Sequence, residues 1–230
     1  MRVAAIILAG GRGTRIDPNF PKQFMEVSKK PIILHTIERI AECSYINLII
    51  VVCIADYFDY LQQLVDTLDI DKDIKIVCGG STGVESTRIG IFNVPSDYDA
   101  VVVHDGNRPM IDQEIMSDLY SVYVKHGNAV SSIPTVELTY ESLDGYSSKK
   151  YVNRDTIWKT HTPQMYNLSE VKGVYSEVMN NLDYNDYSST TEIYCKLGKS
   201  IFFSRGKTTN IKITFPEDLT IFESLLALNK

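Results

Sequence analysis

The feature that most constrains the fold is a regular alternation between short apolar runs and longer amphipathic stretches. Val3–Leu8 and Ile46–Cys53 are almost continuously apolar, which is typical of strands buried on both faces of a sheet. Between them, Pro31–Cys43 carries apolar residues at the spacing of one helix face. A buried strand, a helix and another buried strand form the pattern of a parallel sheet covered on both sides. The sequence therefore predicts an α/β fold with a single doubly wound, mostly parallel sheet.

The alternation continues along most of the chain. Further strands are predicted at Ile74–Cys78, Ala100–Val103, Ala129–Ile133, Ile201–Ser204 and Ile211–Ile213, and further helices at Tyr57–Leu68, Gly83–Phe92, Asp112–His126, Leu168–Asn180, Ser188–Leu197 and Pro216–Leu228. It is interrupted at about 135–153, where polar residues surround the pair Asp144-Gly145, which is typical of a hairpin turn. We expect this segment to be a protruding β-hairpin arm.

Length and charge restrict the domain organisation and the partners. A chain of 230 residues favours one domain over 1–230, and 44% hydrophobic with 23% charged residues is typical of a globular protein. The net charge of −6 argues against nucleic acid as a partner, since a phosphate-backbone binder needs a basic face. The first apolar run is too short for a signal sequence or a membrane span. We therefore expect a cytoplasmic protein with no nucleic-acid or membrane partner.

The four cysteines do not follow the spacing of a metal site or a disulfide framework. Cys43, Cys53, Cys78 and Cys195 are scattered, without a C-x-x-C pair. Three of them lie in apolar or amphipathic runs, so buried free thiols are expected.

A glycine-rich turn, Ala9–Arg15, follows the first predicted strand. Glycine allows backbone N–H groups to approach and surround a phosphate, and Arg12, Arg15 and Lys22 add positive charge nearby. A plain turn without a ligand is the alternative. A dinucleotide fingerprint would need glycine at Ile16, and the P-loop sequence Gly-Lys-Ser/Thr is absent, so an NAD-dependent oxidoreductase is disfavoured.

The segment His104–Pro109 follows the predicted strand Ala100–Val103. Asp105 at this strand end suits Mg²⁺, which prefers oxygen ligands, and Arg108 suits an anion. The alternative is that Asp105 caps a turn and pairs with Arg108. His104 is interpreted as a packed strand-end residue and not as a catalytic base.

Two later segments carry cations beside turn or strand signals. Arg154 precedes Thr160–Gln164, which is read as a proline turn that either holds an anionic substrate or orders a surface loop. Lys212 lies between Ile211 and Ile213, and strand alternation points it away from the face that the isoleucines bury. It is either solvent-exposed or a second phosphate clamp.

These motifs extend over nearly the whole chain. They are the glycine loop with Arg15, Lys22 and Gln23; Gly79-Gly80 with Ser86; His104-Asp105 with Arg108-Pro109; Arg154; Thr162-Pro163-Gln164; Asp186; and Asn210-Ile211-Lys212-Ile213-Thr214 with Pro216-Glu217-Asp218. In this order they resemble the cytidylyltransferase family of methylerythritol-phosphate and ribitol-5-phosphate cytidylyltransferases. That family makes CDP-methylerythritol for isoprenoid synthesis and CDP-ribitol for wall and capsule synthesis.

The resemblance implies a Rossmann-like nucleotidyltransferase fold and a reaction of CTP with a polyol phosphate, which yields a CDP-polyol and pyrophosphate. It implies Mg²⁺ as cofactor, with Asp105 as the metal residue, and a homodimer formed through the arm. It implies catalytic roles for Arg15, Lys22 and Lys212; nucleotide binding by Ala9, Gly10, Gly11, Gly80, Ser86 and Asp105; and acceptor binding by Arg108, Arg154, Thr162 and Asn185.

The chain departs from the family pattern at a few positions. Gly83 stands where an arginine is usual, Glu137-Leu138 where Asp-Thr is usual, and Asn185-Asp186 where Thr-Asp is usual. Because acceptor-side hydroxyls are replaced while the catalytic cations remain, we expect ribitol 5-phosphate or a similar polyol phosphate as the acceptor. Methylerythritol 4-phosphate is the alternative acceptor. A catalytically silent binding subunit, suggested by the missing arginine at Gly83, is the alternative from another class.

Overall fold

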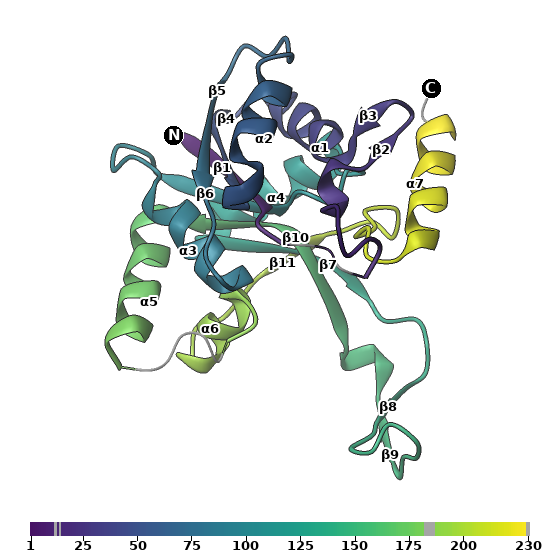
Figure 1. Ribbon diagram of the computed structural model, residues 1–230. Helices are drawn as coiled ribbons and strands as arrows, with labels where there is room; N and C mark the ends of the chain where they lie inside the picture. The colour runs from purple at the N-terminus through teal and green to yellow at the C-terminus, as the bar shows by residue number, and fades with distance from the viewer. Residues whose placement is uncertain (12, 14, 182–186, 229–230) are drawn as a thin grey trace.

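A sheet of seven strands runs through the middle of the molecule, with helices on both faces (Figure 1). The computed structural model describes residues 1–228 with the exception of 12, 14 and 182–186. The strand order is β11-β7-β10-β6-β1-β4-β5; β10 is antiparallel to both neighbours, and the other adjacent pairs are parallel. The strands are β1 Val3–Ala9, β4 Ile46–Cys53, β5 Asp73–Cys78, β6 Ala100–Asp105, β7 Asn128–Pro134, β10 Trp158–Asn167 and β11 Phe203–Arg205.

The helices form two layers. One face of the sheet packs against α1 Ile32–Ala41, α2 Phe58–Val65 and α4 Gln113–His126, and the other against α3 Gly83–Phe92, α5 Leu168–Asn181 and α6 Thr190–Lys196. Short 3-10 turns are η1 Lys22–Phe24, η2 Ala55–Tyr57 and η3 Arg154–Thr156. Among the described residues, no helix combines the length and the apolar character that crossing a membrane requires.

A third, smaller cluster lies beside the sheet. It joins the short ladder of β2 Glu26–Val27 and β3 Lys30–Pro31 to α7 Pro216–Leu228, which Figure 1 shows in yellow next to β2 and β3. Phe222 of α7 is fully buried in this cluster together with Ile213. The cluster thereby attaches the C-terminal segment to the loops that follow β1.

Successive residues of β1 are buried against opposite helix layers. Val3, Ala5 and Ile7 belong to the cluster formed with α1, α2 and α4, whereas Ala4 and Ile6 belong to the cluster formed with α3, α5 and α6. Each of these side chains is 0% exposed. A parallel strand covered on both faces needs an apolar residue at every position. This explains why the predicted runs lack polar alternation.

The predicted alternation is confirmed for most of the chain. β4, α3 and α7 have the predicted bounds, and most of the other elements differ by one to three residues at an end. Local signals set the ends of α4: Asp112 Oδ1 accepts from Ile115 N at 2.9 Å, and Gly127, with φ +83°, ends the helix.

The interpretation of Thr160–Gln164 as a proline turn is wrong. The segment belongs to β10, which pairs with β6 and β7. The register with β7 shifts between Thr160 and Gln164, so the residues between them, including the cis Thr162–Pro163 peptide, lie outside the ladder. Proline cannot donate to a ladder, which explains the turn signal. Pairing on both sides of the interruption keeps the strand continuous.

The predicted strand at Ile211–Ile213 is also wrong. Ile213 N donates to Asn107 O at 2.9 Å, and Ile213 O accepts from Asn107 Nδ2 at 2.7 Å. Asn107, in the loop after β6, therefore supplies the two hydrogen bonds that a neighbouring strand would otherwise make with Ile213. The predicted alternation is confirmed nevertheless, because Ile213 is buried and Lys212 is exposed.

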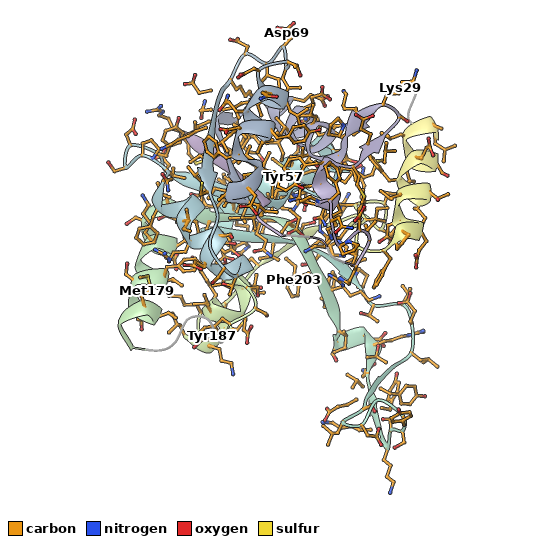
Figure 2. The ribbon with its side chains drawn as sticks, in the orientation of Figure 1. Lys29, Tyr57, Asp69, Met179, Tyr187 and Phe203 are labelled. Carbon is orange, nitrogen blue, oxygen red and sulfur yellow. The ribbon has the colours of Figure 1, made fainter. Side chains whose placement is uncertain are left out.

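The hairpin arm is confirmed. β8 Thr139–Glu141 and β9 Lys150–Val152 pair antiparallel and project from the body, and their side chains stand clear of it (Figures 1 and 2). At the tip, Asp144 Oδ1 accepts from the backbone N–H of Tyr146 and of Ser147, and Gly145 has φ +73°. Leu143 and Tyr146 are each 98% exposed, so the arm carries apolar side chains that this chain does not cover.

The prediction for the cysteines is half right. All four are free thiols, and Cys43 and Cys53 are buried as expected. Cys78 and Cys195 are exposed. Cys78 is the last residue of β5, and Cys195 lies near the end of α6, where the chain leaves the core.

Candidate active site

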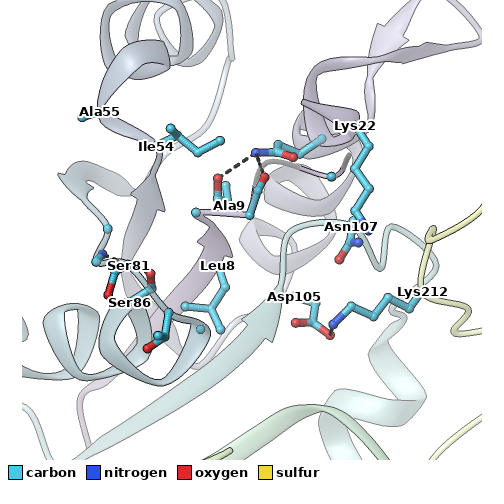
Figure 3. Close-up of a pocket in the computed structure, with 18 of the residues that line it drawn as sticks. Leu8, Ala9, Lys22, Ile54, Ala55, Ser81, Ser86, Asp105, Asn107 and Lys212 are labelled. Atoms are coloured by element: carbon cyan, nitrogen blue, oxygen red, sulfur yellow. Dashed lines mark hydrogen bonds and ion pairs between the residues drawn. The ribbon is translucent and has the colours of Figure 1, made fainter. Parts of the chain in front are cut away.

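The glycine loop leaves β1 at the carboxyl end of the sheet. Gln23, 3% exposed, donates Nε2 to Ala9 O at 2.8 Å and to Gly11 O at 3.0 Å, and these bonds hold the start of the loop (Figure 3). Gly13 has φ +66°, and a Cβ atom there would lie 2.8 Å from Lys22 Cγ. Glycine is therefore required for the loop to pass this close to Lys22.

A cleft of about 710 Å³ lies over this loop. It is lined by the predicted catalytic residues Arg15, Lys22 and Lys212 and by the predicted nucleotide ligands Ala9, Gly10, Gly11, Gly80, Ser86 and Asp105. The ends of β1, β5 and β6 meet here, at the edge where parallel sheets place their ligands. Residues up to 203 positions apart in the numbering are thus brought to one cavity, while their individual roles stay predictions.

Asp105 is the one carboxylate that lines this cleft among the described residues. Its Oδ2 accepts from Arg108 Nε at 3.0 Å and from Lys212 Nζ at 3.1 Å, and Figure 3 shows the lysine pointing at the carboxylate. Burial alone would raise the pKa of Asp105, but the charges of Lys212 and Arg108 outweigh it and lower the pKa to about 2. Asp105 is therefore ionised at neutral pH, and it pairs with Arg108 while also facing the cleft.

Positive charge exceeds negative charge around the cleft. Lys22 is 8% exposed, and burial followed by the charges of Lys212 and Arg15 lowers its pKa to about 8. The Arg15 guanidinium lies over the ring of Phe215, 5.5 Å from its centroid. Three cations facing a single carboxylate repel one another, and an anionic ligand relieves that repulsion. The cleft is suited to a polyphosphate.

The N-terminus of α3 forms the opposite wall. Thr82 Oγ1 accepts from Glu85 N at 3.1 Å and caps the helix, and Ser86 Oγ accepts from Gly80 N at 3.1 Å. Thr82 and Gly83 line the cleft, so the positive end of the helix dipole faces it. This wall presents backbone polar groups and the hydroxyl residues Ser81, Thr82 and Ser86, which suits recognition of an uncharged part of a ligand.

A second cavity of about 290 Å³ adjoins the first and shares Asp105 and Lys212 with it. Arg108 and Thr162, two predicted acceptor ligands, line it. Asp105 N donates to Thr162 Oγ1 at 3.0 Å, Arg108 Nη1 donates to Asn210 O at 2.7 Å, and Asn210 Nδ2 donates to Thr162 O at 2.8 Å. This network joins three distant segments at the boundary between the two cavities.

Other predicted residues do not lie at the cavities. Arg154, on η3 at the base of the arm, donates Nη1 to Val136 O at 2.8 Å and lines neither cavity. Leu138, 64% exposed, belongs to the arm. Arg12 and the pair Asn185-Asp186 lie outside the described residues.

His104 is confirmed as a packed residue. It is 0% exposed, its Nε2 lies 3.0 Å from Arg108 O, and burial lowers its pKa to about 4.

The sequence analysis gave no individual role to several residues of the site, although His161 and Gln164 lie in the segment Thr160–Gln164, for which substrate binding was one of two alternatives. Asn107 lines the larger cavity, and His161, Gln164 and Ser188–Thr191 line the smaller one. Ser188–Thr191 had a different local signal: hydroxyl residues before a helix are typical of an N-cap, and Ser189 Oγ accepts from Glu192 N at 3.2 Å. The others depend on contacts between distant segments.

A mostly parallel sheet, a glycine loop and a cationic cleft joined to a second cavity define the class of protein as an α/β nucleotidyltransferase. The sequence profile of the IspD family, 2-C-methyl-D-erythritol 4-phosphate cytidylyltransferase, matches residues 3–227, and the chain belongs to this family. The class of enzyme expected from the motifs, a CTP-dependent nucleotidyltransferase, is thereby confirmed.

Curated relatives align over nearly the whole chain. A ribitol-5-phosphate cytidylyltransferase of Lacticaseibacillus paracasei is 32% identical and covers 97% of both chains. Another, from Vibrio parahaemolyticus, is 33% identical over 96% of this chain and 94% of that protein. The chloroplastic 2-C-methyl-D-erythritol 4-phosphate cytidylyltransferase of Oryza sativa is 30% identical over 97% of this chain and 74% of that protein.

Solved structures agree with the fold. The 4-diphosphocytidyl-2C-methyl-D-erythritol synthase of Anaerococcus prevotii superposes with a TM-score of 0.85 at 22% identity and covers 98% of both chains. The predicted fold class is confirmed by this match and by the observed sheet.

Proposed function

We propose that the protein transfers the cytidylyl group of CTP to ribitol 5-phosphate or a similar polyol phosphate, giving a CDP-polyol and pyrophosphate. The observation that carries the proposal is the pair of adjoining cavities that share Asp105 and Lys212. The larger cavity suits a triphosphate, and the smaller one suits a compact phosphate ester. The relatives named ribitol-5-phosphate cytidylyltransferases favour ribitol 5-phosphate over methylerythritol 4-phosphate.

The proposed reaction depends on alignment of the two substrates and on neutralisation of their negative charge, and it does not need a strong general base. A phosphate oxygen of the acceptor, already anionic, attacks the α-phosphorus of CTP, and the bond from that phosphorus to the bridging oxygen of pyrophosphate breaks. The main obstacle is the approach of two anions, so catalysis consists of alignment and charge neutralisation. Arg15, Lys22 and Lys212 would stabilise the charge that grows on the α-phosphate and on the leaving pyrophosphate.

Mg²⁺ fits the donor set at Asp105. The ion pairs of this carboxylate with Arg108 and Lys212 engage Oδ2, which leaves Oδ1 as the candidate metal ligand. Mg²⁺ in nucleotide sites is usually held by one or two carboxylates together with substrate phosphates and water. Bound there, the ion would neutralise charge on the phosphates of CTP.

Selectivity for cytosine would come from the wall opposite the cations. Backbone groups at Ala9–Gly11 and Gly80, together with the Ser86 hydroxyl, line the larger cavity and would contact polar edges of the base and the ribose. A base that leaves such groups unpaired is rejected, often by a large factor. Arg108 and Thr162 would hold the acceptor.

The experiment is a pyrophosphate-release assay with CTP, Mg²⁺, ribitol 5-phosphate and methylerythritol 4-phosphate, with UTP and ATP as alternative nucleotides. We expect turnover with CTP and a higher kcat/KM for ribitol 5-phosphate. A higher value for methylerythritol 4-phosphate would assign the isoprenoid reaction instead. Absence of pyrophosphate release with every acceptor would favour a silent binding subunit.

We also propose that the protein acts in the cytoplasm, where CTP is available, and that it is a homodimer. The exposed apolar residues of the arm support the dimer, because an isolated two-stranded hairpin is at best marginally stable.

A further inference from the structure

The smaller cavity contains a polar group that the proposed reaction does not use. His161 lines this cavity, and its Nδ1 is buried without a hydrogen-bond partner among the described residues. Buried polar atoms in proteins are nearly always paired, so each exception requires an explanation. Because Nδ1 has no accessible surface in the empty cavity, a ligand can become its partner only when the ring turns toward the cavity that His161 lines.

The backbone explains why His161 lines the cavity. β10 leaves its ladder with β7 between Thr160 and Gln164, and its pairing with β6 begins at Gln164. His161 therefore lies in an irregular part of the strand, next to Thr162, which receives the bond from Asp105 N. Interruptions of this kind often redirect a side chain beside an active site.

The ring is suited to a hydroxyl and not to a phosphate. Burial, followed by the charges of Arg108 and Lys159, lowers the pKa of His161 to about 4, so the ring is neutral at neutral pH. A neutral imidazole offers one donor and one acceptor nitrogen, which matches a hydroxyl group. A phosphate has only acceptor oxygens when it is ionised, and Arg108 and Lys212 in the same cavity are better partners for it.

The other residues that line the smaller cavity also offer uncharged hydrogen-bonding groups. Thr160, Gln164 and the run Ser188–Thr191 surround the cavity with hydroxyl and amide groups. Some of these are engaged within the protein, since Gln164 Oε1 accepts from Tyr166 and the hydroxyls of Thr190 and Tyr175 are bonded to each other at 2.8 Å. The cavity therefore combines cations with uncharged hydrogen-bonding groups, as a polyol phosphate requires.

We propose that His161 determines acceptor specificity, and that on binding its ring turns toward the cavity so that Nδ1 forms a hydrogen bond with a hydroxyl group on the carbon chain of the polyol phosphate. The proposal rests on the proposed function, because it concerns the acceptor of that reaction.

The test compares two substitutions with a set of acceptors. His161→Phe keeps a ring but removes the nitrogen, whereas His161→Asn places an amide atom near the position of Nδ1. For each variant, kcat/KM is measured for ribitol 5-phosphate and its monodeoxy analogues, with the KM for CTP as the internal reference. His126→Phe, an exposed histidine stacked on Phe202, is the matched control.

We expect the wild type to prefer ribitol 5-phosphate over one deoxy analogue by about tenfold, the value of one neutral hydrogen bond. His161→Phe should lose that preference while the KM for CTP is unchanged, and His161→Asn should retain part of it. If His161→Phe lowered kcat/KM equally for every acceptor, or kept the wild-type preference for ribitol 5-phosphate, the role of His161 would be refuted. The proposed function would still stand. If wild-type protein uses CTP but no polyol phosphate, the proposed function fails and this inference fails with it.

Discussion

At the scale of single residues, the site gathers cations around one ionised carboxylate. Lys212 and Arg108 both reach Asp105 Oδ2, and Lys22 is buried nearby with a lowered pKa. The arrangement keeps positive charge available for a ligand, because one carboxylate cannot neutralise all of it.

Removal of either lysine of the cleft should slow the reaction. We expect Lys22→Ala and Lys212→Ala each to lower kcat/KM by an amount equivalent to about 2–4 kcal/mol, typical of a lost transition-state contact. Lys30→Ala is the control, since Lys30 Nζ pairs with Glu38 at 2.6 Å and does not line the cleft. Turnover is followed by pyrophosphate release and folding by thermal unfolding. Wild-type rates in both cleft variants would contradict the assignment.

CTP binding should weaken in alkaline solution. Because the pKa of Lys22 in the free protein is about 8, its charge is present below that pH and is lost as the pH rises through it. An anionic ligand favours the protonated form, so the Kd for CTP should increase between about pH 7.5 and 9.5, with proton uptake on binding. Lys22→Arg keeps its charge and should bind with a flat profile. The Kd for CTP is measured by calorimetric titration at each pH. The same pH dependence in wild type and Lys22→Arg would exclude Lys22 as the cause.

At the scale of elements, the loops after the strands are held by side chains from distant segments. Asn107 supports Ile213 through two hydrogen bonds and so positions Lys212, although no strand forms there. The glycine loop is held in the same way by Gln23. The rigid sheet fixes where these loops begin, and hydrogen bonds from polar side chains fix the path of the loop backbone.

Loss of the Asn107 side chain should therefore act through Lys212. We expect Asn107→Ala to lower kcat severalfold in wild type and to have little further effect in a Lys212→Ala background, as expected for coupled residues. Asn128→Ala is the matched control, because Asn128 is equally buried and bonds Ser200 and Phe202 away from the cavities. It should reduce the melting temperature without a change in kcat. Additive effects of the two substitutions at the site would refute the coupling.

At the scale of the whole molecule, the body contains both cavities, and the arm stands apart from it (Figure 1). The ladder of β8 and β9 is separate from the main sheet, so the arm contributes little to the core. Exposed apolar residues on such an arm are typical of an interface between proteins.

Shortening the arm should separate the subunits. We expect the wild type to have the mass of a dimer at micromolar concentration in light scattering, and a variant with 139–152 replaced by a short glycine linker to have the mass of a monomer. Ser substitutions at the fully exposed tip residues Leu143 and Tyr146 test whether apolar burial is the cause. A monomeric wild type, or an unchanged mass after the deletion, would count against the dimer.

Much of the fold follows from local sequence patterns. The runs that form β1 and β4 are apolar at almost every position because both faces of the sheet are covered. This pattern can be recognised within each short segment of sequence, without knowledge of the rest of the fold. Caps such as Asp112 and Gly127 mark helix ends for equally local reasons. The glycine loop and Asp105 could be chosen in advance because they stand at the ends of strands, and Lys22 because it adds positive charge near that loop.

By itself, then, the sequence determined the order of elements, the edge of the sheet that carries the site and the cations that line it, since each depends on periodicity or on a short motif. Only the tertiary structure decided that Thr160–Gln164 belongs to a strand, that Ile211–Ile213 does not, and that His161 lines a cavity. The bonds from Asp105 to Thr162 and from Arg108 to Asn210 join residues 57 and 102 positions apart. Such contacts form only when the packed core brings those segments together, and no local pattern of residues encodes them.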